Sequence, residues 1–173
     1  MARTKASVDL PGLVEAHYFS PFGCFKLTGT AQGLRSVRLV DTKPCPAGPI
    51  PSELRTAVQQ LDEYFKQQRE DFDLELDFSG STSFYQSVWQ ELVKIPYGRT
   101  TSYLAIAERL GDPKAIRAVG QANRNNPIAI IVPCHRVIAK SGDLQGYFYG
   151  LDFKRRLLEL ENPLSFARQG SLF

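Results

Sequence analysis

Hydrophobic and polar positions in the first half of the chain follow two different periods. Apolar and β-branched side chains gather in residues 24–28 and 37–40, which predicts two strands. Apolar residues of the segment 54–65 recur at helical spacing, which predicts a helix that begins near Ser52 and uses that serine as its cap. Residues 72–78 alternate strictly between apolar and acidic side chains, the pattern of a half-buried strand.

A short run of small polar residues, 79–83, follows these elements and is typical of a linker. We therefore expect an α/β domain at residues 1–82 and a second domain at residues 83–173. The apolar spacing after the linker is helical, and it predicts a helix over about residues 84–92.

The second domain also contains a helix-turn-helix pattern. One helix is expected over residues 101–110, with Gly111 at its stop. The next is expected over residues 113–124, with Asp112 as its cap and Pro113 in its first turn. Two short helices joined by a glycine-containing turn are typical of this motif, although other helical hairpins share the pattern.

The end of the chain combines a buried segment with a helix. Residues 128–132 form a continuous apolar run that stops at Pro133, so we expect a buried segment that delivers the following residues to a fixed place. A final helix is expected over residues 152–161. The second domain is therefore predicted to be mainly α.

Composition and charge indicate an ordinary globular protein with an anionic partner. The chain is 43% apolar and 23% charged, and it has no apolar run of the roughly 20 residues that span a bilayer. No apolar stretch follows the N-terminal residues, so we expect an intracellular protein. Residues 1–82 carry 9 basic and 11 acidic side chains, whereas residues 83–173 carry 12 and 7. The basic second half favours an anionic partner, although ordinary solvated surface explains the charge equally well.

The cysteines are few and odd in number: Cys24, Cys45 and Cys134. Such a set argues against a disulfide framework. A zinc site built from Cys24, Cys45 and His17 would lack a fourth ligand and has poor spacing, so we expect no metal.

The sequence Pro133-Cys134-His135-Arg136 carries the candidate chemistry. A thiol becomes a good nucleophile only as a thiolate, so it needs a base or a positive charge nearby. His135 is the only histidine of the second half. Neighbouring side chains often diverge, and a bridging water is then an alternative to direct contact.

Glu161 is the candidate partner of this histidine. It follows Leu157 by four residues and Phe153 by eight, which places it on the apolar face of the last helix. A buried carboxylate needs a partner, and His135 would complete a Cys–His–Glu triad. The alternative is a helix-end glutamate that frays into water, which the pattern alone slightly favours.

The helix expected at 113–124 carries Arg117, Gln121 and Arg124 on one stripe. Four of its other positions are small, Ala115, Ala118, Gly120 and Ala122, and only Ile116 and Val119 are large and apolar. Such a helix can approach a phosphate backbone or an opened base stack closely. An exposed basic face on a small core helix is the alternative. Ser102 and Tyr103, at the start of the preceding helix, either hold a phosphate or merely cap that helix.

Roughly residues 82–162 resemble the O6-alkylguanine-DNA alkyltransferases. The matching runs are FYQSVW at 84–89, IPYGRTTSY at 95–103, RAVG at 117–120 and VPCHRVI at 132–138. The N-terminal half matches only in general architecture. The resemblance implies a ribonuclease-H-like α/β domain, with a small antiparallel sheet and a helix, followed by a winged helix-turn-helix domain.

The resemblance also implies DNA repair by direct damage reversal. The protein would flip an O6-alkylguanine, mainly O6-methylguanine, out of duplex DNA and transfer the alkyl group irreversibly to Cys134 in a single turnover. O4-methylthymine is a second candidate substrate. No metal, cofactor or membrane is implied, the partner is double-stranded DNA, and we expect a monomer in the cytoplasm, or in the nucleus of a eukaryote.

Residue roles follow from the same resemblance. Cys134 is the alkyl acceptor, His135 its base acting through a water, and Glu161 the carboxylate that orients His135. Asn126 is the hinge between the recognition helix and the active-site turn, and Tyr103 rotates the flanking phosphate and protonates the departing guanine. DNA contacts are implied for Ser102, Arg117, Ala118, Gly120, Gln121 and Arg124, with Arg117 as the finger that enters the base stack. The pocket is implied to contain Arg136, Val137, Tyr147, Phe148 and Tyr149.

The sequence departs from the family at Phe148 and Tyr149, where small residues are common. These rings either narrow the pocket or stack on the base. We expect O6-methyl adducts to react well and O6-benzyl adducts poorly. Two other functions fit parts of the pattern: a non-catalytic lesion binder, which Cys134 argues against, and a Cys–His–Glu hydrolase, which would need an oxyanion hole that the sequence does not show.

Overall fold

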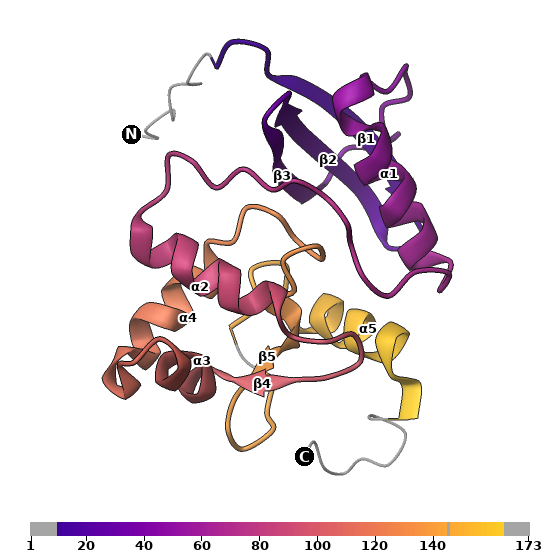
Figure 1. The fold of residues 1–173 in the computed structure, drawn as a ribbon. Coiled ribbons are helices and arrows are strands. Elements are labelled where there is room, and N and C mark those ends of the chain that lie inside the picture. The colour runs from indigo at the N-terminus through magenta and orange to yellow at the C-terminus, as the bar shows by residue number, and fades with distance from the viewer. Residues whose placement is uncertain (1–9, 145, 165–173) are drawn as a thin grey trace, which may run out of the picture.

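The N-terminal half is a three-stranded antiparallel sheet covered by one helix (Figure 1). The computed structural model describes residues 10–144 and 146–164. The strands are β1 (Val14–Ser20), β2 (Gly23–Thr30) and β3 (Gly33–Val40), and they lie in the order β1-β2-β3. The helix α1 (Ser52–Phe65) packs its apolar stripe against this sheet. The two expected strands are confirmed as parts of β2 and β3, whereas β1 was not predicted.

The helix α1 begins where the periodicity places it, but its cap is different. Pro51 occupies the cap position, and the Ser52 hydroxyl donates to Glu53 Oε2 at 3.1 Å instead of accepting from the helix backbone. The prediction of Ser52 as the cap is therefore wrong. Proline suits this position because its fixed φ already matches the entry into a helix.

Residues 72–78 do not form a regular strand, and they alternate in exposure only as far as Glu75, because Asp77 is half-buried in an ion pair with Arg35 at 2.6 Å. They meet β3 at one parallel bridge, where Leu34 N donates to Glu75 O and Asp77 N donates to Leu34 O, both at 2.9 Å. The Gln60 side chain takes both backbone groups of Asp73, at 3.1 and 2.9 Å. These groups are therefore not available to a strand ladder, which explains why the strand prediction is wrong.

The C-terminal half is mainly helical, as expected. It contains α2 (Ser83–Val93), α3 (Tyr103–Arg109), α4 (Ile116–Arg124) and α5 (Leu151–Glu161), with short 3₁₀ turns η1 (Pro113–Ala115) and η2 (Cys134–Arg136). The helices α3 and α4 form the predicted helix-turn-helix. Asp112 caps η1 by accepting from Lys114 N at 3.0 Å, as predicted.

Two strands of two residues join the helix-turn-helix to the cysteine segment. The helix α3 is shorter than predicted, because Thr101 and Ser102 form β4 and pair in parallel with β5 (Val137–Ile138). This pairing places the start of α3 beside the residues that follow Cys134, and the same approach is visible in Figure 1.

The two halves of the described chain share a continuous core. The middle of β3 hydrogen-bonds to the apolar run, since Val37 N donates to Pro127 O at 2.9 Å and Ala129 N donates to Val37 O at 3.0 Å. The buried location predicted for residues 128–132 is confirmed. None of the helices within residues 10–144 and 146–164 is long and apolar enough to cross a membrane.

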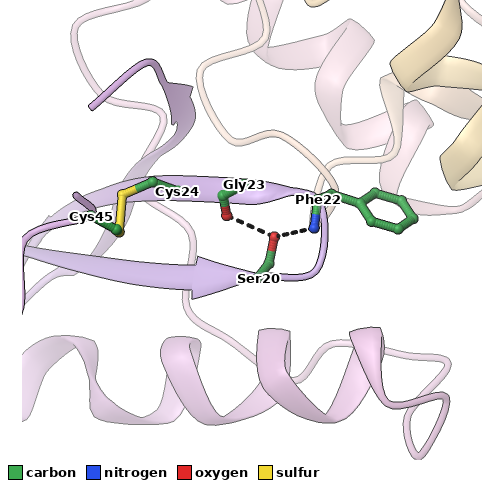
Figure 2. Close-up of a disulfide and its surroundings, with 5 residues drawn as sticks. All are labelled: Ser20, Phe22, Gly23, Cys24 and Cys45. Atoms are coloured by element: carbon green, nitrogen blue, oxygen red, sulfur yellow. Dashed lines mark hydrogen bonds between the residues drawn. A yellow bond between two sulfur atoms is a disulfide. The ribbon is translucent and has the colours of Figure 1, made fainter. Parts of the chain in front are cut away.

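Cys24 and Cys45 form a disulfide, with their Cα atoms 5.5 Å apart (Figure 2). It joins the start of β2 to the proline-rich loop after β3, beside the β1–β2 turn that Ser20 closes through Gly23 O and Phe22 N. The expectation that the cysteines form no disulfide is therefore wrong for this pair, because the loop folds back along β2 and brings distant sulfurs together. Both sulfurs are consumed by the bond, so neither is a zinc ligand.

Candidate active site

Cys134 stands at the start of η2, at the end of a tightly folded apolar run. Ile130 has a φ of +71°, a left-handed conformation that costs a β-branched residue about 1–2 kcal/mol. Two hydrogen bonds hold the turn closed: Val132 N donates to Ile128 O at 3.0 Å, and Cys134 N donates to Val132 O at 2.8 Å. The segment thus fixes the cysteine backbone by local geometry that hydrophobicity alone does not reveal.

Two asparagines connect this turn to α4. Asn126 accepts from Ile128 N at 2.9 Å and donates to Val132 O at 2.8 Å, so one side chain bridges both ends of the turn. Asn123, on the buried face of α4, donates to Cys134 O at 3.4 Å. The resemblance pointed to Asn126, whereas Asn123 was missed. A buried asparagine beside Val119 on a helix with a polar outer face was the available signal.

Glu161 is buried at the end of α5 and is surrounded by hydrogen-bond donors. His135 Nε2 lies 2.6 Å from Oε1, and Tyr64 Oη donates to the same oxygen at 2.8 Å. Arg136 adds a two-pronged ion pair at 2.9 Å to each oxygen, and Gly98 N donates to Oε2 at 3.3 Å. The predicted His135–Glu161 pair is therefore brought together, and the fraying alternative is wrong.

The side chain of Arg136 belongs to this carboxylate network. Besides Glu161, its guanidinium donates to Ile95 O at 2.7 Å and lies over the Tyr97 ring. Its guanidinium is thus engaged by Glu161, Ile95 O and the Tyr97 ring, and its predicted place in the substrate pocket stays a prediction. Neither Arg136 nor Tyr64 was identified as a partner of Glu161 from the sequence.

Burial and charge set the protonation of the site at rest. Burial by itself would raise the pKa of Glu161, but His135 and Arg136 more than offset this and hold that pKa well below its ordinary range. Burial lowers the pKa of His135 despite the opposing effect of Glu161, and Arg136 and Lys154 lower it further. Burial also raises the pKa of the Cys134 thiol. The carboxylate is therefore ionised, while the thiol and the imidazole are neutral.

Several groups around the sulfur favour its ionisation once a proton acceptor is present. The Asn126 side chain, the Lys154 ammonium and the Tyr147 hydroxyl all lower the pKa of Cys134. Lys154 is fully buried, donates to Val137 O at 2.5 Å, and has its pKa lowered by burial to about 8. His135 Nδ1 has no hydrogen-bond partner among the described residues, so it is available to a substrate or a water.

The loop at 146–150 lies against the sulfur on one side and α5 on the other. Tyr147 is buried and its ring stacks on Phe153, with centroids 6.2 Å apart. Phe148 is 58% exposed and meets Tyr149 edge-on at 5.0 Å. A side chain at Gly146 would come within 3.5 Å of Tyr103 Oη, which places Tyr103 opposite this loop. Tyr103, Tyr147 and Tyr149 thus lie close enough to Cys134 for it to raise their pKa values, whereas Phe148 is exposed. Val137 directly follows η2 and accepts a hydrogen bond from Lys154.

The outer face of α4 is lean and basic. Arg117, Ala118, Gln121 and Arg124 are exposed, and a side chain added at Gly120 would meet nothing within 4 Å. Ser102 accepts from Ala105 N at 3.1 Å, so it caps α3. The described residues contain no cluster of three or more His, Cys, Asp or Glu side chains that could hold a metal.

A helix-turn-helix whose second helix leads into a buried Cys–His–Glu set defines a DNA-binding protein with a reactive cysteine. Two family models match: the 6-O-methylguanine DNA methyltransferase ribonuclease-like domain at residues 13–78, and the DNA-binding domain of the same family at residues 83–163. The chain belongs to the 6-O-methylguanine DNA methyltransferase family.

Curated relatives and solved structures agree with this assignment. The chain is 49% identical to the methylated-DNA–protein-cysteine methyltransferase of Mycobacterium tuberculosis H37Rv, over 82% of this chain and 88% of the relative. The corresponding protein of Methanosarcina barkeri is 48% identical, with coverage of 82% and 92%. The crystal structure of the M. tuberculosis O6-methylguanine methyltransferase matches with a TM-score of 0.77 and 46% identity, covering 87% and 93% of the two chains.

A structure of the M. tuberculosis protein in complex with DNA also matches, with a TM-score of 0.76 and 48% identity, over 85% of this chain and 91% of that one. The expected fold class, family and class of reaction are confirmed. DNA is thereby supported as the partner.

Proposed function

We propose that Cys134 accepts the alkyl group of O6-alkylguanine in duplex DNA, mainly O6-methylguanine, with O4-methylthymine as a second substrate. The sulfur attacks the alkyl carbon in line, the S–C bond forms, and the C–O bond breaks with its electron pair remaining on guanine. A proton delivered to the base completes the departure. The thioether has no route back in this site, so each molecule acts once.

The observation that carries this proposal is a buried thiol, Cys134, followed directly in sequence by a buried histidine whose Nε2 lies 2.6 Å from the ionised carboxylate of Glu161. Because burial raises the pKa of Cys134, the thiol must give up its proton as it attacks. The free Nδ1 of His135 is the acceptor, through a bridging water, and Glu161 stabilises the imidazolium that forms. Tyr103 supplies the proton to the departing guanine.

We assign the exposed face of α4 to the DNA. Its small residues suit the minor groove, which is only about 6 Å wide. Arg117 enters the stack where the nucleotide has left, and Asn126 holds the hinge between α4 and the cysteine turn. Base extrusion costs a few kcal/mol and costs least for a weakly paired damaged base, which aids selection. Further DNA contacts are assigned to Ser102, Ala118, Gly120, Gln121 and Arg124.

The flipped base is assigned to the space between Tyr103 and the loop at 146–150, lined by Val137, Tyr147, Phe148 and Tyr149. Phe148 and Tyr149 restrict this space, so O6-benzylguanine reacts more slowly than O6-methylguanine. Replacing both rings by glycine should raise the benzyl rate and leave the methyl rate nearly unchanged. Equal wild-type rates for the two adducts would contradict this assignment.

We further propose that the protein acts as a monomer in the cytoplasm, or in the nucleus if its source is a eukaryote. The domain division between residues 82 and 83 belongs to the same proposal, and it is supported by the start of α2 at Ser83.

The test of the function is methyl transfer from a duplex that carries one O6-methylguanine. Wild-type protein should gain one methyl group per chain on the peptide that contains Cys134, and Cys134→Ala should gain none. A Cys24→Ser/Cys45→Ser double variant is the matched control, because it removes the other two sulfurs and should still be methylated. An unmodified Cys134 peptide in the presence of excess damaged duplex would refute the proposal.

A further inference from the structure

Tyr64 brings a hydroxyl from the N-terminal half into the carboxylate network of the C-terminal half. It lies on α1, is fully buried, and donates to Glu161 Oε1 at 2.8 Å across 97 residues of sequence. Its ring is fixed by edge-on or tilted contacts with Phe65, Phe72 and Tyr97, with centroids 5.3 to 6.1 Å apart. The hydroxyl is therefore held in one place by packing.

We propose that Tyr64 is a positioning residue for alkyl transfer, which draws negative charge from Glu161 and so keeps His135 unprotonated until the thiol attacks. This inference rests on the proposed function. It also gives the ribonuclease-like half of the protein a part in the reaction, since no other group of that half touches Glu161 among the described contacts.

The geometry separates the effect of Tyr64 from that of the other donors. Arg136 engages both oxygens and Gly98 engages Oε2, so the carboxylate plane is fixed without Tyr64. Tyr64 and His135 both hydrogen-bond to Oε1, so the Tyr64 hydroxyl reduces the negative charge that this oxygen presents to the imidazole. A donor on a carboxylate favours its charged form and weakens it as a proton acceptor. Removing the hydroxyl should make His135 more basic.

Within residues 10–144 and 146–164, the charged and titratable groups packed around Tyr64 and the His135–Glu161 pair lie on five segments, one of which is the loop at 146–150, which contributes Tyr147. The turn η2 contributes Cys134 and Arg136, and α5 contributes Lys154. The connection between α2 and β4 contributes Tyr97, and α1 contributes Tyr64. Burial raises the pKa of Tyr64 well above its ordinary value, so its hydroxyl donates throughout the working pH range. Of the described side chains that hydrogen-bond to Glu161, Tyr64 is the one that can be changed to an isosteric residue without removing a base or a charge.

The experiment compares Tyr64→Phe with Tyr18→Phe. Tyr18 donates to Asp62 at 3.1 Å on the same sheet–helix unit, so it is a matched loss of one tyrosine hydroxyl away from the site. The single-turnover rate of methyl transfer is measured between pH 5 and 9. Tyr64→Phe should move the midpoint of the acidic limb up by about 0.5–1 pH unit, which slows transfer roughly 3- to 10-fold below that midpoint. The alkaline plateau should stay within about 2-fold, and Tyr18→Phe should move neither.

A second readout does not depend on the reaction. NMR titration of the His135 ring in the free protein should show a higher pKa in Tyr64→Phe than in wild type or in Tyr18→Phe. A fluorinated tyrosine at position 64 is a stronger hydrogen-bond donor with nearly the same packing, so it should lower the pKa of His135. This variant supplies the test if Tyr64→Phe does not fold. If the pKa of His135 is the same in both variants as in the wild type, Tyr64 has only a packing role and the proposal is refuted. If His135 shifts but the wild type leaves Cys134 unmethylated, the proposed function fails and not the Tyr64 contact.

Discussion

Gly120 offers a test in which protein stability and DNA binding should change in opposite directions. It lies in the middle of α4, where glycine costs about 0.8–1.0 kcal/mol relative to alanine. A side chain built there meets no atom within 4 Å, so the free protein has no steric reason to keep glycine. Gly120→Ala should therefore raise the free energy of unfolding by about 1 kcal/mol, or the Tm by about 2–4 °C.

On DNA the same added atoms would occupy the space between α4 and the minor groove. Forcing side-chain carbons into a close interface costs about 1–3 kcal/mol, so Gly120→Leu should weaken binding roughly 5- to 150-fold, and Gly120→Ala less. Thermal unfolding and duplex titration at one salt concentration measure the two effects. Gln59→Leu, at an exposed position of α1, is the control for added apolar surface. Undiminished DNA affinity in Gly120→Leu would refute the assignment of this face, and a less stable Gly120→Ala would refute the open-space argument.

Three further predictions concern the disulfide, the carboxylate and the basic stripe. Replacing Cys24 and Cys45 by serine should lower the free energy of unfolding by about 3 kcal/mol, because the disulfide closes a loop of 21 residues. Urea unfolding with and without reductant measures this difference, and equal stabilities would contradict it. Because the pKa of Glu161 is held below its ordinary 4.5, the stability that it contributes is complete above that pH and should be lost as the pH falls below it. Glu161→Gln should cost about 3–5 kcal/mol at neutral pH and flatten this acid dependence, whereas a variant as stable as wild type would show that the buried charges need no partner. Arg124→Ala should reduce the slope of log Kd against log salt by about 0.9, and an unchanged slope would exclude a phosphate contact by Arg124.

Much of the fold was predictable because the periodic patterns matched the packing. The apolar stripe of α1 and the caps around η1 are local signals, and both located their elements correctly. The segment 72–78 alternates in exposure only as far as Glu75, and it forms no regular strand, because the Gln60 side chain hydrogen-bonds to both backbone groups of Asp73. A local sequence pattern does not reveal a hydrogen-bonding side chain that lies 13 residues away in the chain. The Cys24–Cys45 bond was missed for the same reason, since only the fold of the proline-rich loop brings the sulfurs together.

In the candidate site, too, local features were predictable from the sequence and features that depend on distant segments were not. The position of Glu161 on the apolar face of its helix was readable, and the structure shows it bonded to His135. The sequence did not show whether this carboxylate is buried or frayed, because its burial depends on hydrogen bonds from Tyr64 and Arg136, which lie on other segments. The left-handed turn at Ile130 was also hidden, since a β-branched residue gives no local indication of positive φ.

The distribution of charge in this site suits a protein that can react only once. A permanent cysteine thiolate in the interior would need desolvation at rest, and it would also react with stray electrophiles and oxidants. The structure places its permanent charges one step away, on Glu161 and Arg136, and leaves Cys134 and His135 neutral. Charge separation then occurs only during attack on the alkyl carbon, when Glu161 and the Lys154 ammonium are already in place to stabilise the two new charges. Reactivity is thereby confined to the moment when a flipped base fills the pocket, which matters most where a spent cysteine cannot be restored.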